Sequence, residues 1–428
     1  MQSLDGFANL VAEMPHSQVS RRTFFGRVAG GSALAAFSSS LAAAQSPERF
    51  WQQVRRQFPF SEDRVPMNAA NLCPSPTIVA DRVAELTREI DADCSFQNRE
   101  RFKQTLEDSR ARVAAQLGVN ADEIALVRNT SESNNTINNG LDLADGDEVV
   151  IWDQNHPTNH VAWEVRAKRR GFSVVKVAVP AKPKTFDDLI EPFRRAITPR
   201  TRVLALTHAS NVSGIRLPVK ELAEIAHQSG IHVHVDGAQT WGALKVNLKQ
   251  LGCDSYSASG HKWFVGPKEV GLLYVRDERI ADIWPNIVAP GWGTGPGTEL
   301  AGARKFESMG QRDDAALAAI AATADFHDAI GTTEIEARLF ELVTLLKSGL
   351  REIGAKLVTP MQRELSAGVC ISEVPAANRA ELLDQMYEKH GIAGSTSGGF
   401  RLCPHVYNTR DHVERAVAGL KSLKRLWV

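Results

Sequence analysis

The sequence predicts an α/β fold, with a mostly parallel sheet between layers of helices in a large domain and a smaller C-terminal α+β domain. Short β-branched segments alternate with amphipathic helical segments between residues 124 and 275. Such alternation is typical of a parallel sheet that is buried on both faces. Helical patterns dominate after residue 305. The 428 residues are 43% hydrophobic, enough for more than one domain core.

Local periodicity places the individual elements. Apolar residues recur three and four positions apart in residues 77–94 and 101–117, which predicts two helices. Strands are predicted at Ile124–Val127, Glu148–Trp152, Ser173–Val177, Arg202–Thr207, Ile231–Val235 and Gly271–Val275. Further helices are predicted at 313–330, 333–353, 377–390 and 410–427, with short strands near 368–373 and 400–403. The predicted parts are an N-terminal arm (45–67), a large domain (68–305) and a small domain (306–428).

Charge and cysteine content exclude several classes of function. Basic and acidic residues are balanced at 50 each, without a long run of one sign. Strong attraction to nucleic acid or to an anionic membrane is therefore not predicted. The five cysteines form no CxxC pair. Neither a thioredoxin-like motif nor a zinc ribbon is available.

The first 44 residues have the composition of an export signal. Arg21 and Arg22 precede an uncharged stretch of small and apolar residues that ends in alanines before Gln45. This order is typical of a secretory signal, and paired arginines indicate the Tat export machinery. The stretch is short for a membrane span, so we expect no stable membrane anchor. An amphipathic N-terminal helix and a retained anchor stay open. We expect cleavage near Ala44–Gln45 and a periplasmic mature protein.

The loop around Lys262 is the most informative segment. Lys262 is followed by the apolar residues 263–265 and preceded by Ser259 and His261. Apolar neighbours desolvate an amine and keep it partly neutral, which a Schiff-base lysine requires. Ser259 and His261 can donate hydrogen bonds to a phosphate beside it. The alternative is a surface lysine whose stem packs on apolar neighbours.

Two further segments predict a ligand crevice at the carboxyl edge of the sheet. Asp236 ends the strand Ile231–Val235, and a carboxylate at this position of a parallel strand points into the crevice. Pyridoxal 5'-phosphate (PLP) requires such an anion at its pyridine nitrogen. Thr130 and Ser131 begin a helix after the first strand, where backbone N–H groups and hydroxyls favour phosphate. Simple N-capping is the alternative for both.

A metal site is the competing interpretation of the strand that ends at Asp236. His232, His234 and Asp236 are spaced two residues apart and therefore share one strand face, an arrangement that could ligate zinc. No further histidine follows closely after Asp236, and the strand is otherwise apolar. We therefore predict no metal and expect both histidines to be buried and hydrogen-bonded.

Together these segments resemble the class V aminotransferase family of fold-type I PLP enzymes. The resemblance rests on Val235-Asp236-Gly237-Ala238-Gln239, on Ser259-Gly260-His261-Lys262 and on Gly266-Pro267. It covers nearly the whole chain from Asn68 to the C-terminus. It implies the fold-type I architecture, with a large PLP-binding domain and a small C-terminal domain.

The resemblance also implies a role for each matching residue. Lys262 holds PLP covalently and acts in catalysis with Asp236 and His156. Asp236 pairs with the pyridine nitrogen, and His156 stacks on the ring unless it is only a structural histidine. The implied cofactor-binding residues are Thr130, Ser131, His156, Asn211, Asp236, Gln239, Ser259, His261 and Lys262.

Substrate and partner contacts follow from the same resemblance. Arg401 matches the arginine that clamps a substrate α-carboxylate, with Asn211 beside it. A structural ion pair is the alternative for Arg401. Fold-type I sites are usually completed by a second subunit, so a homodimer is expected. Gln311 stands where relatives often carry a threonine that reaches the partner's phosphate.

Departures from the family narrow the expected reaction. The loop Gly394–Gly399 lacks the cysteine of the cysteine desulfurases, so desulfurase activity is not expected. An export signal is unusual in the family. An exported member of this length is similar to the periplasmic enzymes of fluorescent pseudomonads that convert the glutamate side-chain moiety of the siderophore pyoverdine to succinamide. An aminotransferase or epimerase of a free amino acid stays open, as does a non-catalytic protein that binds PLP.

Overall fold

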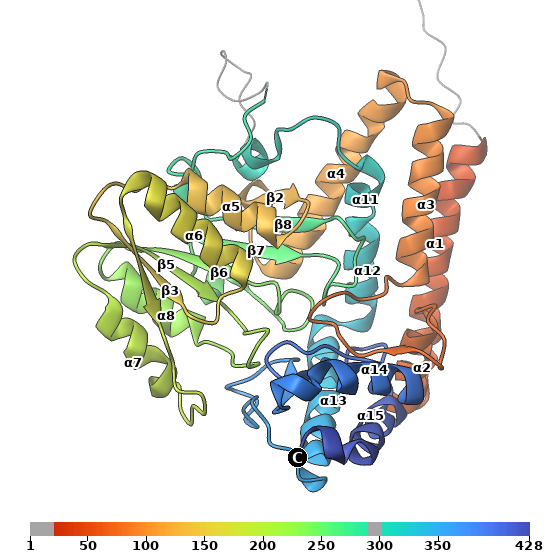
Figure 1. The fold of residues 1–428 in the computed structure, drawn as a ribbon. Coiled ribbons are helices and arrows are strands. Elements are labelled where there is room, and N and C mark those ends of the chain that lie inside the picture. The colour runs from red at the N-terminus through yellow and green to blue at the C-terminus, as the bar shows by residue number, and fades with distance from the viewer. Residues whose placement is uncertain (1–20, 290–301) are drawn as a thin grey trace, which may run out of the picture.

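The computed structural model describes residues 21–289 and 302–428 of the chain. A large domain contains a seven-stranded sheet, and a smaller domain contains the C-terminus (Figure 1). The predicted α/β architecture with a smaller C-terminal domain is therefore confirmed.

The central sheet has the strand order β2-β8-β7-β6-β5-β3-β4. Its strands are β2 (Ile124–Val127), β3 (Glu148–Trp152), β4 (Ser173–Val177), β5 (Thr201–Thr207), β6 (His232–Asp236), β7 (Ser255–Ser259) and β8 (Gly271–Val275). Strands β3 to β7 pair in parallel, and β8 is antiparallel to both β2 and β7. The mostly parallel sheet is as predicted. Strand β7 was missed because its serines have little β-propensity, although all five of its residues are buried.

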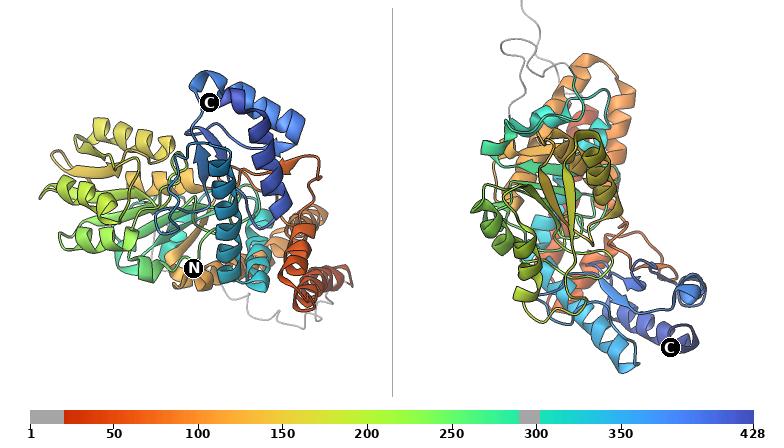
Figure 2. Two further views of the ribbon diagram at one scale, coloured as in Figure 1. Left: turned by 90° about the horizontal axis from the view of Figure 1, so that it is seen from below. Right: turned by 60° about the vertical axis from the view of Figure 1, so that its left-hand side comes forward.

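Helices cover both faces of this sheet (Figure 2). On one face lie α5 (Thr130–Gly140) and α6 (Pro157–Arg170), and on the other lie α7 (Asp187–Ala196) and α8 (Val219–His227). In β6, Val233 and Val235 pack into the core beneath α7 and α8. Because side chains alternate along a strand, His232, His234 and Asp236 point toward the α5 face.

A group of four helices packs beside the sheet. This group comprises α3 (Thr77–Ala92), α4 (Phe96–Leu117), α11 (Asp314–Ala318) and α12 (Ile320–Ile330). The single helix predicted over residues 313–330 is divided at Ala319, and its first part is capped by the Asp313 side chain. Short helices elsewhere are α2 (Pro47–Arg56), α9 (Leu248–Leu251) and α10 (Asp277–Ile280).

The small domain contains α13 (Thr332–Glu352), α14 (Arg379–His390) and α15 (Arg410–Ser422). Its strands are β1 (Val65–Pro66), paired in parallel with β10 (Ile392–Ala393), and β9 (Cys370–Ser372), paired antiparallel with β11 (Phe400–Leu402). Val65 and Met67 lie in the core of this domain, whereas α11 and α12 pack on α3 and α4. Packing thus places the end of the predicted arm with the small domain and residues 314–330 with the large one.

Helix α1 (Arg21–Ala42) spans part of the predicted export signal, whose first 20 residues lie outside the described ranges. Its C-terminal part contacts the folded body. Phe37 stacks on Phe326 of α12 with ring centroids 5.1 Å apart, and Leu41 is buried. In residues 21–289 and 302–428, every helix is too short or too polar to cross a membrane. Cleavage after Ala44 stays a prediction, and it would uncover Phe326.

Candidate active site

One cavity lies where the carboxyl ends of β5, β6 and β7 meet the N-termini of α5 and α6. Its volume is about 200 Å³. It is lined by Asn129, Thr130, Ser131, His156, Thr158, Thr207, Asn211, Asp236, Ala238, Gln239, Ser259, His261 and Lys262. The structure therefore brings together all the cofactor-binding residues that the family resemblance implies.

The N-terminus of α5 forms a polar cradle at one end of the cavity. The Thr130 N–H donates to Ser259 Oγ at 2.8 Å, and the hydroxyls of these residues lie 2.6 Å apart. The Nδ1 atom of His261 is buried and has no hydrogen-bond partner. Burial, with the nearby Lys262 charge, lowers the pKa of His261 to about 4, so the ring is neutral at pH 7. A helix N-terminus, two hydroxyls and an unpartnered ring nitrogen suit a phosphate.

Asp236 occupies a buried position at the end of β6. Its Oδ2 accepts a hydrogen bond from Asn134 Nδ2 at 2.9 Å, and its Oδ1 accepts one from the Ala238 N–H at 3.0 Å. A carboxylate held in this way suits the pyridine nitrogen of PLP. Thr207 is its register partner on β5, and the buried Thr207 hydroxyl has no partner. Sequence reasoning missed Thr207, although it ends a predicted strand just as Asp236 does.

Lys262 lies in the cavity on the loop that connects β7 to β8. Burial lowers the pKa of Lys262. The positive charge of Arg401 adds to this effect, while the negative charge of Asp236 opposes it. A lysine with a lowered pKa presents more of the neutral amine, which is the nucleophile that captures an aldehyde. The residues present therefore fit PLP.

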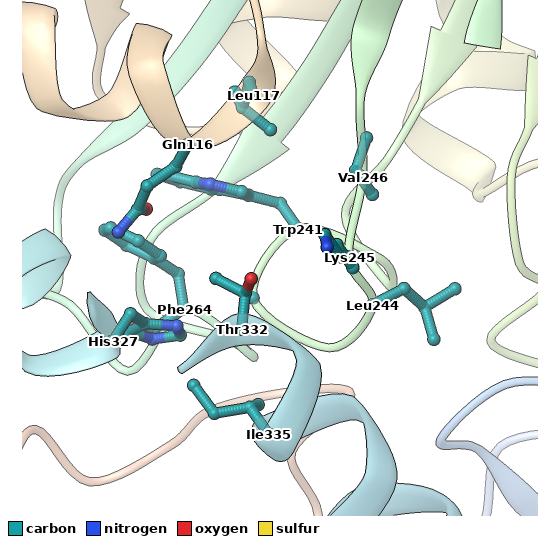
Figure 3. A pocket seen from close by; sticks show the side chains of 11 residues that line it. Gln116, Leu117, Trp241, Leu244, Lys245, Val246, Phe264, His327, Thr332 and Ile335 are labelled. Carbon is teal, nitrogen blue, oxygen red and sulfur yellow. The ribbon is translucent and has the colours of Figure 1, made fainter. Parts of the chain in front are cut away.

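Aromatic stacking anchors the Lys262 loop. Trp241 and Phe264 stack with ring centroids 3.9 Å apart, and Phe264 stacks on His327 of α12 at 4.8 Å. Figure 3 shows these three rings together around a small second pocket, with Gln116 from α4. The indole N–H of Trp263 donates to Gln239 Oε1 at 2.7 Å. Neighbouring elements therefore fix the backbone on which Lys262 is mounted.

Val265 shows how firmly this loop is held. Its φ is 52°, although a β-branched residue strongly disfavours the left-handed region. Such a conformation costs about 1–3 kcal/mol and persists only where the surroundings impose it. Val265 is fully buried, and its N–H donates to the Lys262 carbonyl at 2.9 Å. The turn after Lys262 is thus strained and rigidly packed.

His156 and Gln239 both line the cavity, as predicted. His156 caps α6, and its Nδ1 accepts from the Thr158 N–H with the Thr158 hydroxyl 2.8 Å away. Burial, helped by the charge of Lys262, lowers the pKa of His156 and favours a neutral ring. The Gln239 amide donates to the Ala70 carbonyl at 3.0 Å and accepts from Trp263, so it also braces the cavity wall.

Arg401 lies beside the cavity without a carboxylate partner. Its Nη1 donates to the Asn211 carbonyl at 3.0 Å, and its Nη2 donates to Asn68 Oδ1 at 2.9 Å. Its Nε is buried and unpartnered. Within residues 21–289 and 302–428, no acidic group forms an ion pair with Arg401, so the alternative of a structural ion pair is not seen there. Arg401 as a whole is only 4% exposed, and its positive charge has no acidic partner there, so it can attract an anion from the cavity.

Three polar residues near the site, Asn134, Asn68 and Gln311, could be predicted from the sequence to different degrees. Asn134 lies one helical turn after Thr130, so the helix period could have indicated it. No local pattern marks Asn68, which is 333 residues from Arg401 in the chain. Gln311 donates to the Arg312 carbonyl at 2.7 Å, and its contact with a partner subunit stays a prediction.

The histidines of β6 are buried and hydrogen-bonded, as predicted. His234 lies 2.8 Å from Ser255 Oγ through Nδ1 and 2.9 Å from Asn134 Oδ1 through Nε2. His232 Nε2 lies 3.0 Å from the same serine oxygen. In the described ranges, no three histidine, cysteine or acidic side chains are grouped as a metal would need.

Comparisons with known proteins agree with this geometry. Residues 74–416 match the family model for aminotransferase class-V. Isopenicillin N epimerase of Amycolatopsis lactamdurans is 29% identical over 88% of this chain and 99% of that protein. A probable cysteine desulfurase of Methanothermobacter thermautotrophicus is 27% identical over 85% of this chain and 95% of that protein.

Solved structures show the same fold. The cysteine desulfurase CsdA of Escherichia coli superposes with a TM-score of 0.78 at 23% identity, covering 88% of this chain and 99% of that one. The apo cysteine desulfurase of Thermococcus onnurineus has a TM-score of 0.79 at 24% identity, covering 90% and 99%. With its matching sequence model and fold-type I architecture, the chain belongs to the class V aminotransferase family of PLP-dependent enzymes.

Proposed function

We propose that this enzyme acts on the glutamate side-chain moiety of a pyoverdine siderophore in the periplasm and converts it to succinamide. The coarser part, PLP-dependent chemistry on an amino-acid substrate, follows from family membership. The single observation that carries the substrate class is Arg401, a buried guanidinium without a carboxylate partner beside the cavity.

PLP, when bound, withdraws electrons from a bond at the α-carbon of the amine that it carries. The residues of this chain divide the remaining work. Thr130, Ser259 and His261 would hold the phosphate, and Asp236 would accept a hydrogen bond from the protonated pyridine nitrogen. The Lys262 amine would take or return a proton at the substrate α-carbon.

Arg401 supplies the orientation of the substrate. Asn68 and Asn211 each accept one hydrogen bond from its terminal nitrogens and so hold the guanidinium plane in place. A planar guanidinium can bind a carboxylate through two parallel hydrogen bonds. Clamping the α-carboxylate would restrict rotation of the substrate about its amine and so select which bond at the α-carbon reacts.

The cysteines support a reaction other than cysteine desulfuration. The loop Gly394–Gly399 contains no thiol. Cys73 lies close enough to Lys262 for their charges to interact, but it is 1% exposed, and burial raises its pKa to about 12. A thiol with this pKa is a poor nucleophile at neutral pH because the thiolate is the reactive form. Sulfur release from cysteine by the wild-type holoenzyme would refute this part of the proposal.

The proposed reaction uses dioxygen as the oxidant, and its atoms and electrons then balance. The glutamyl group loses its α-carboxylate as carbon dioxide and keeps its nitrogen as the amide. One oxygen atom enters the product, and the other leaves as water. The product is therefore lighter than the substrate by one CH2O unit.

Mass spectrometry of the product tests this assignment. The holoenzyme is incubated under air with a pyoverdine precursor that carries the glutamyl group, beside a Lys262→Ala control. Loss of CH2O with uptake of oxygen supports the proposal. A keto acid product would identify an aminotransferase instead, and binding without turnover would identify a non-catalytic PLP protein.

An epimerase is the second candidate, because isopenicillin N epimerases are 28–29% identical over 87–88% of this chain. Epimerisation leaves the mass of the substrate unchanged and inverts the configuration at the α-carbon. In deuterated water it also introduces one deuterium at that carbon. Chiral analysis of the recovered substrate therefore separates the two candidates.

Export and assembly complete the proposal. The paired Arg21 and Arg22 support Tat export, with Gln45 as the new N-terminus. N-terminal sequencing of the periplasmic protein tests this, with Arg21→Lys/Arg22→Lys as the export-deficient variant. A homodimer is proposed from the family resemblance, and light scattering on the purified holoenzyme tests it. A monomeric, fully active enzyme would contradict the expected assembly.

A further inference from the structure

We propose that a buried chain of hydrogen bonds from His232 through Ser255, His234 and Asn134 positions Asp236 as an acceptor-only carboxylate toward the cofactor cavity. This inference rests on the proposed role of Asp236 at the pyridine nitrogen. His232, Ser255, His234 and Asn134 would then be positioning residues, because none of them lines the cavity.

Three elements bring these side chains together. On β6, His232, His234 and Asp236 share the face toward α5, opposite to Val233 and Val235. The adjacent strand β7 places Ser255 in register with His234. Helix α5 begins at the phosphate cradle and presents Asn134 one turn later. The helix that supplies the cradle thus also supplies the donor to Asp236.

The donor and acceptor roles can be assigned from the carboxylate outward. Asp236 Oδ2 accepts, so Asn134 directs its NH2 toward it and its Oδ1 toward His234. His234 must therefore donate through Nε2, which leaves Nδ1 as an acceptor for the Ser255 hydroxyl. Ser255 Oγ then accepts from His232 Nε2. With this assignment, Ser257 Oγ, which lies 3.4 Å from His234 Nε2, can only accept there, so the hydrogen bonds between Asp236 and His232 run in one direction.

The protonation states of His232 and His234 indicate that these residues orient Asp236 and do not neutralise its charge. Burial lowers the pKa of His234 to about 3 and that of His232 to about 4, so both rings are neutral at pH 7. Lys262, His156 and Tyr256 are the titratable groups that face Asp236. His227, Asp254, Arg279 and Asp282 face His232. The chain therefore aligns Asp236 through N–H dipoles and adds no net charge.

Replacement of Asn134 by leucine tests this role in the holoenzyme. The variant is similar in size but removes the donor to Asp236 Oδ2 and leaves His234 Nε2 with only the Ser257 hydroxyl, 3.4 Å away. Without the Asn134 amide, Asp236 is no longer oriented toward the pyridine nitrogen and would hold its proton less firmly. A less positive ring would let the Lys262-linked nitrogen keep its proton to higher pH. We expect the titration of the visible cofactor band to move upward by about one pH unit. An unchanged titration in Asn134→Leu would overturn the inference.

Matched variants separate positioning from simple loss of packing. In His234→Gln the side-chain amide can still donate toward Asn134, so we expect a titration close to the wild type. His234→Leu cannot donate, so it should follow Asn134→Leu. Thr136→Val is the control because Thr136 is 2% exposed on the same helix and bonds the Glu132 carbonyl outside the chain. Equal shifts in His234→Gln and His234→Leu would indicate packing alone.

The apoenzyme offers a readout that is independent of PLP. In protein labelled with ¹⁵N-histidine, we expect NMR to show the His234 proton on Nε2 and to show that it moves in Asn134→Leu. A proton on Nδ1 would reverse the chain and overturn the inference. Failure of the proposed function looks different. The wild type would then gain no visible band with PLP, whereas the His234 tautomer would still be as inferred.

Discussion

Substitution of Arg401 measures how much of the substrate recognition depends on one guanidinium. In the protein, its terminal nitrogens already bond Asn68 and Asn211, and these bonds fix the plane that a carboxylate would approach. Arg401→Lys keeps the charge but cannot hold both acceptors and two carboxylate oxygens at once. A hydrogen bond to a charged group contributes about 1.5–3 kcal/mol, so kcat/KM should fall by roughly ten- to hundredfold.

The assay compares an α-amino acid substrate with the amine that lacks its carboxylate. We expect Arg401→Lys to lose kcat/KM on the amino acid and to match the wild type on the amine. Arg401→Gln, which removes the charge as well, should lose about a thousandfold on the amino acid alone. Arg216→Lys is the control, because Arg216 also donates to a carbonyl, but to that of Glu364, whereas Arg401 donates to that of the cavity residue Asn211. Equal losses on both substrates would show that Arg401 supports the fold and does not clamp the carboxylate.

Three further predictions follow from burial and charge. Lys262→Ala should remove the visible PLP band and the mass gained on borohydride reduction, while circular dichroism shows an unchanged fold. His208, whose pKa burial lowers to about 3, stays neutral in the native protein while the unfolded chain takes up a proton below about pH 6.5. Unfolding free energy should therefore fall as pH drops from 6.5 toward 3, and by about 1.4 kcal/mol less per pH unit in His208→Gln, measured by urea titration. Phe37→Ala should lower the melting temperature of the full chain, and a protein that starts at Gln45 should bind more of a hydrophobic dye at the uncovered Phe326.

Much of the candidate site could be predicted because its signals are local. The carboxyl end of a parallel strand, as at Asp236, and the start of a helix, as at Thr130, converge on one edge of the sheet in any fold of this class. The loop around Lys262 carries its apolar neighbours in the sequence itself. Each of these residues could be placed without knowing any long-range contact, and all of them line one cavity.

What could not be predicted depends on packing between distant segments. Asn68 orients Arg401 only because the end of the N-terminal arm joins the small domain through β1 and β10. Strand β7 has serine at three of its five positions, and burial between β6 and β8, not propensity, makes it a strand. The packing of α1 on α12 likewise depends on Phe37 meeting Phe326. These features follow from tertiary contacts that a local pattern does not contain.

The spacing of His232, His234 and Asp236 shows where this limit lies. A strand period of two places the three side chains on one face, but it does not determine what they bind there. The element that covers the face decides. Here α5 lays the Asn134 amide between His234 and Asp236, so its two polar atoms occupy the positions through which both would otherwise ligate a metal. On an uncovered sheet face, the spacing of His232, His234 and Asp236 would suit zinc. Beneath α5, the same spacing supports Asp236 as a hydrogen-bond acceptor.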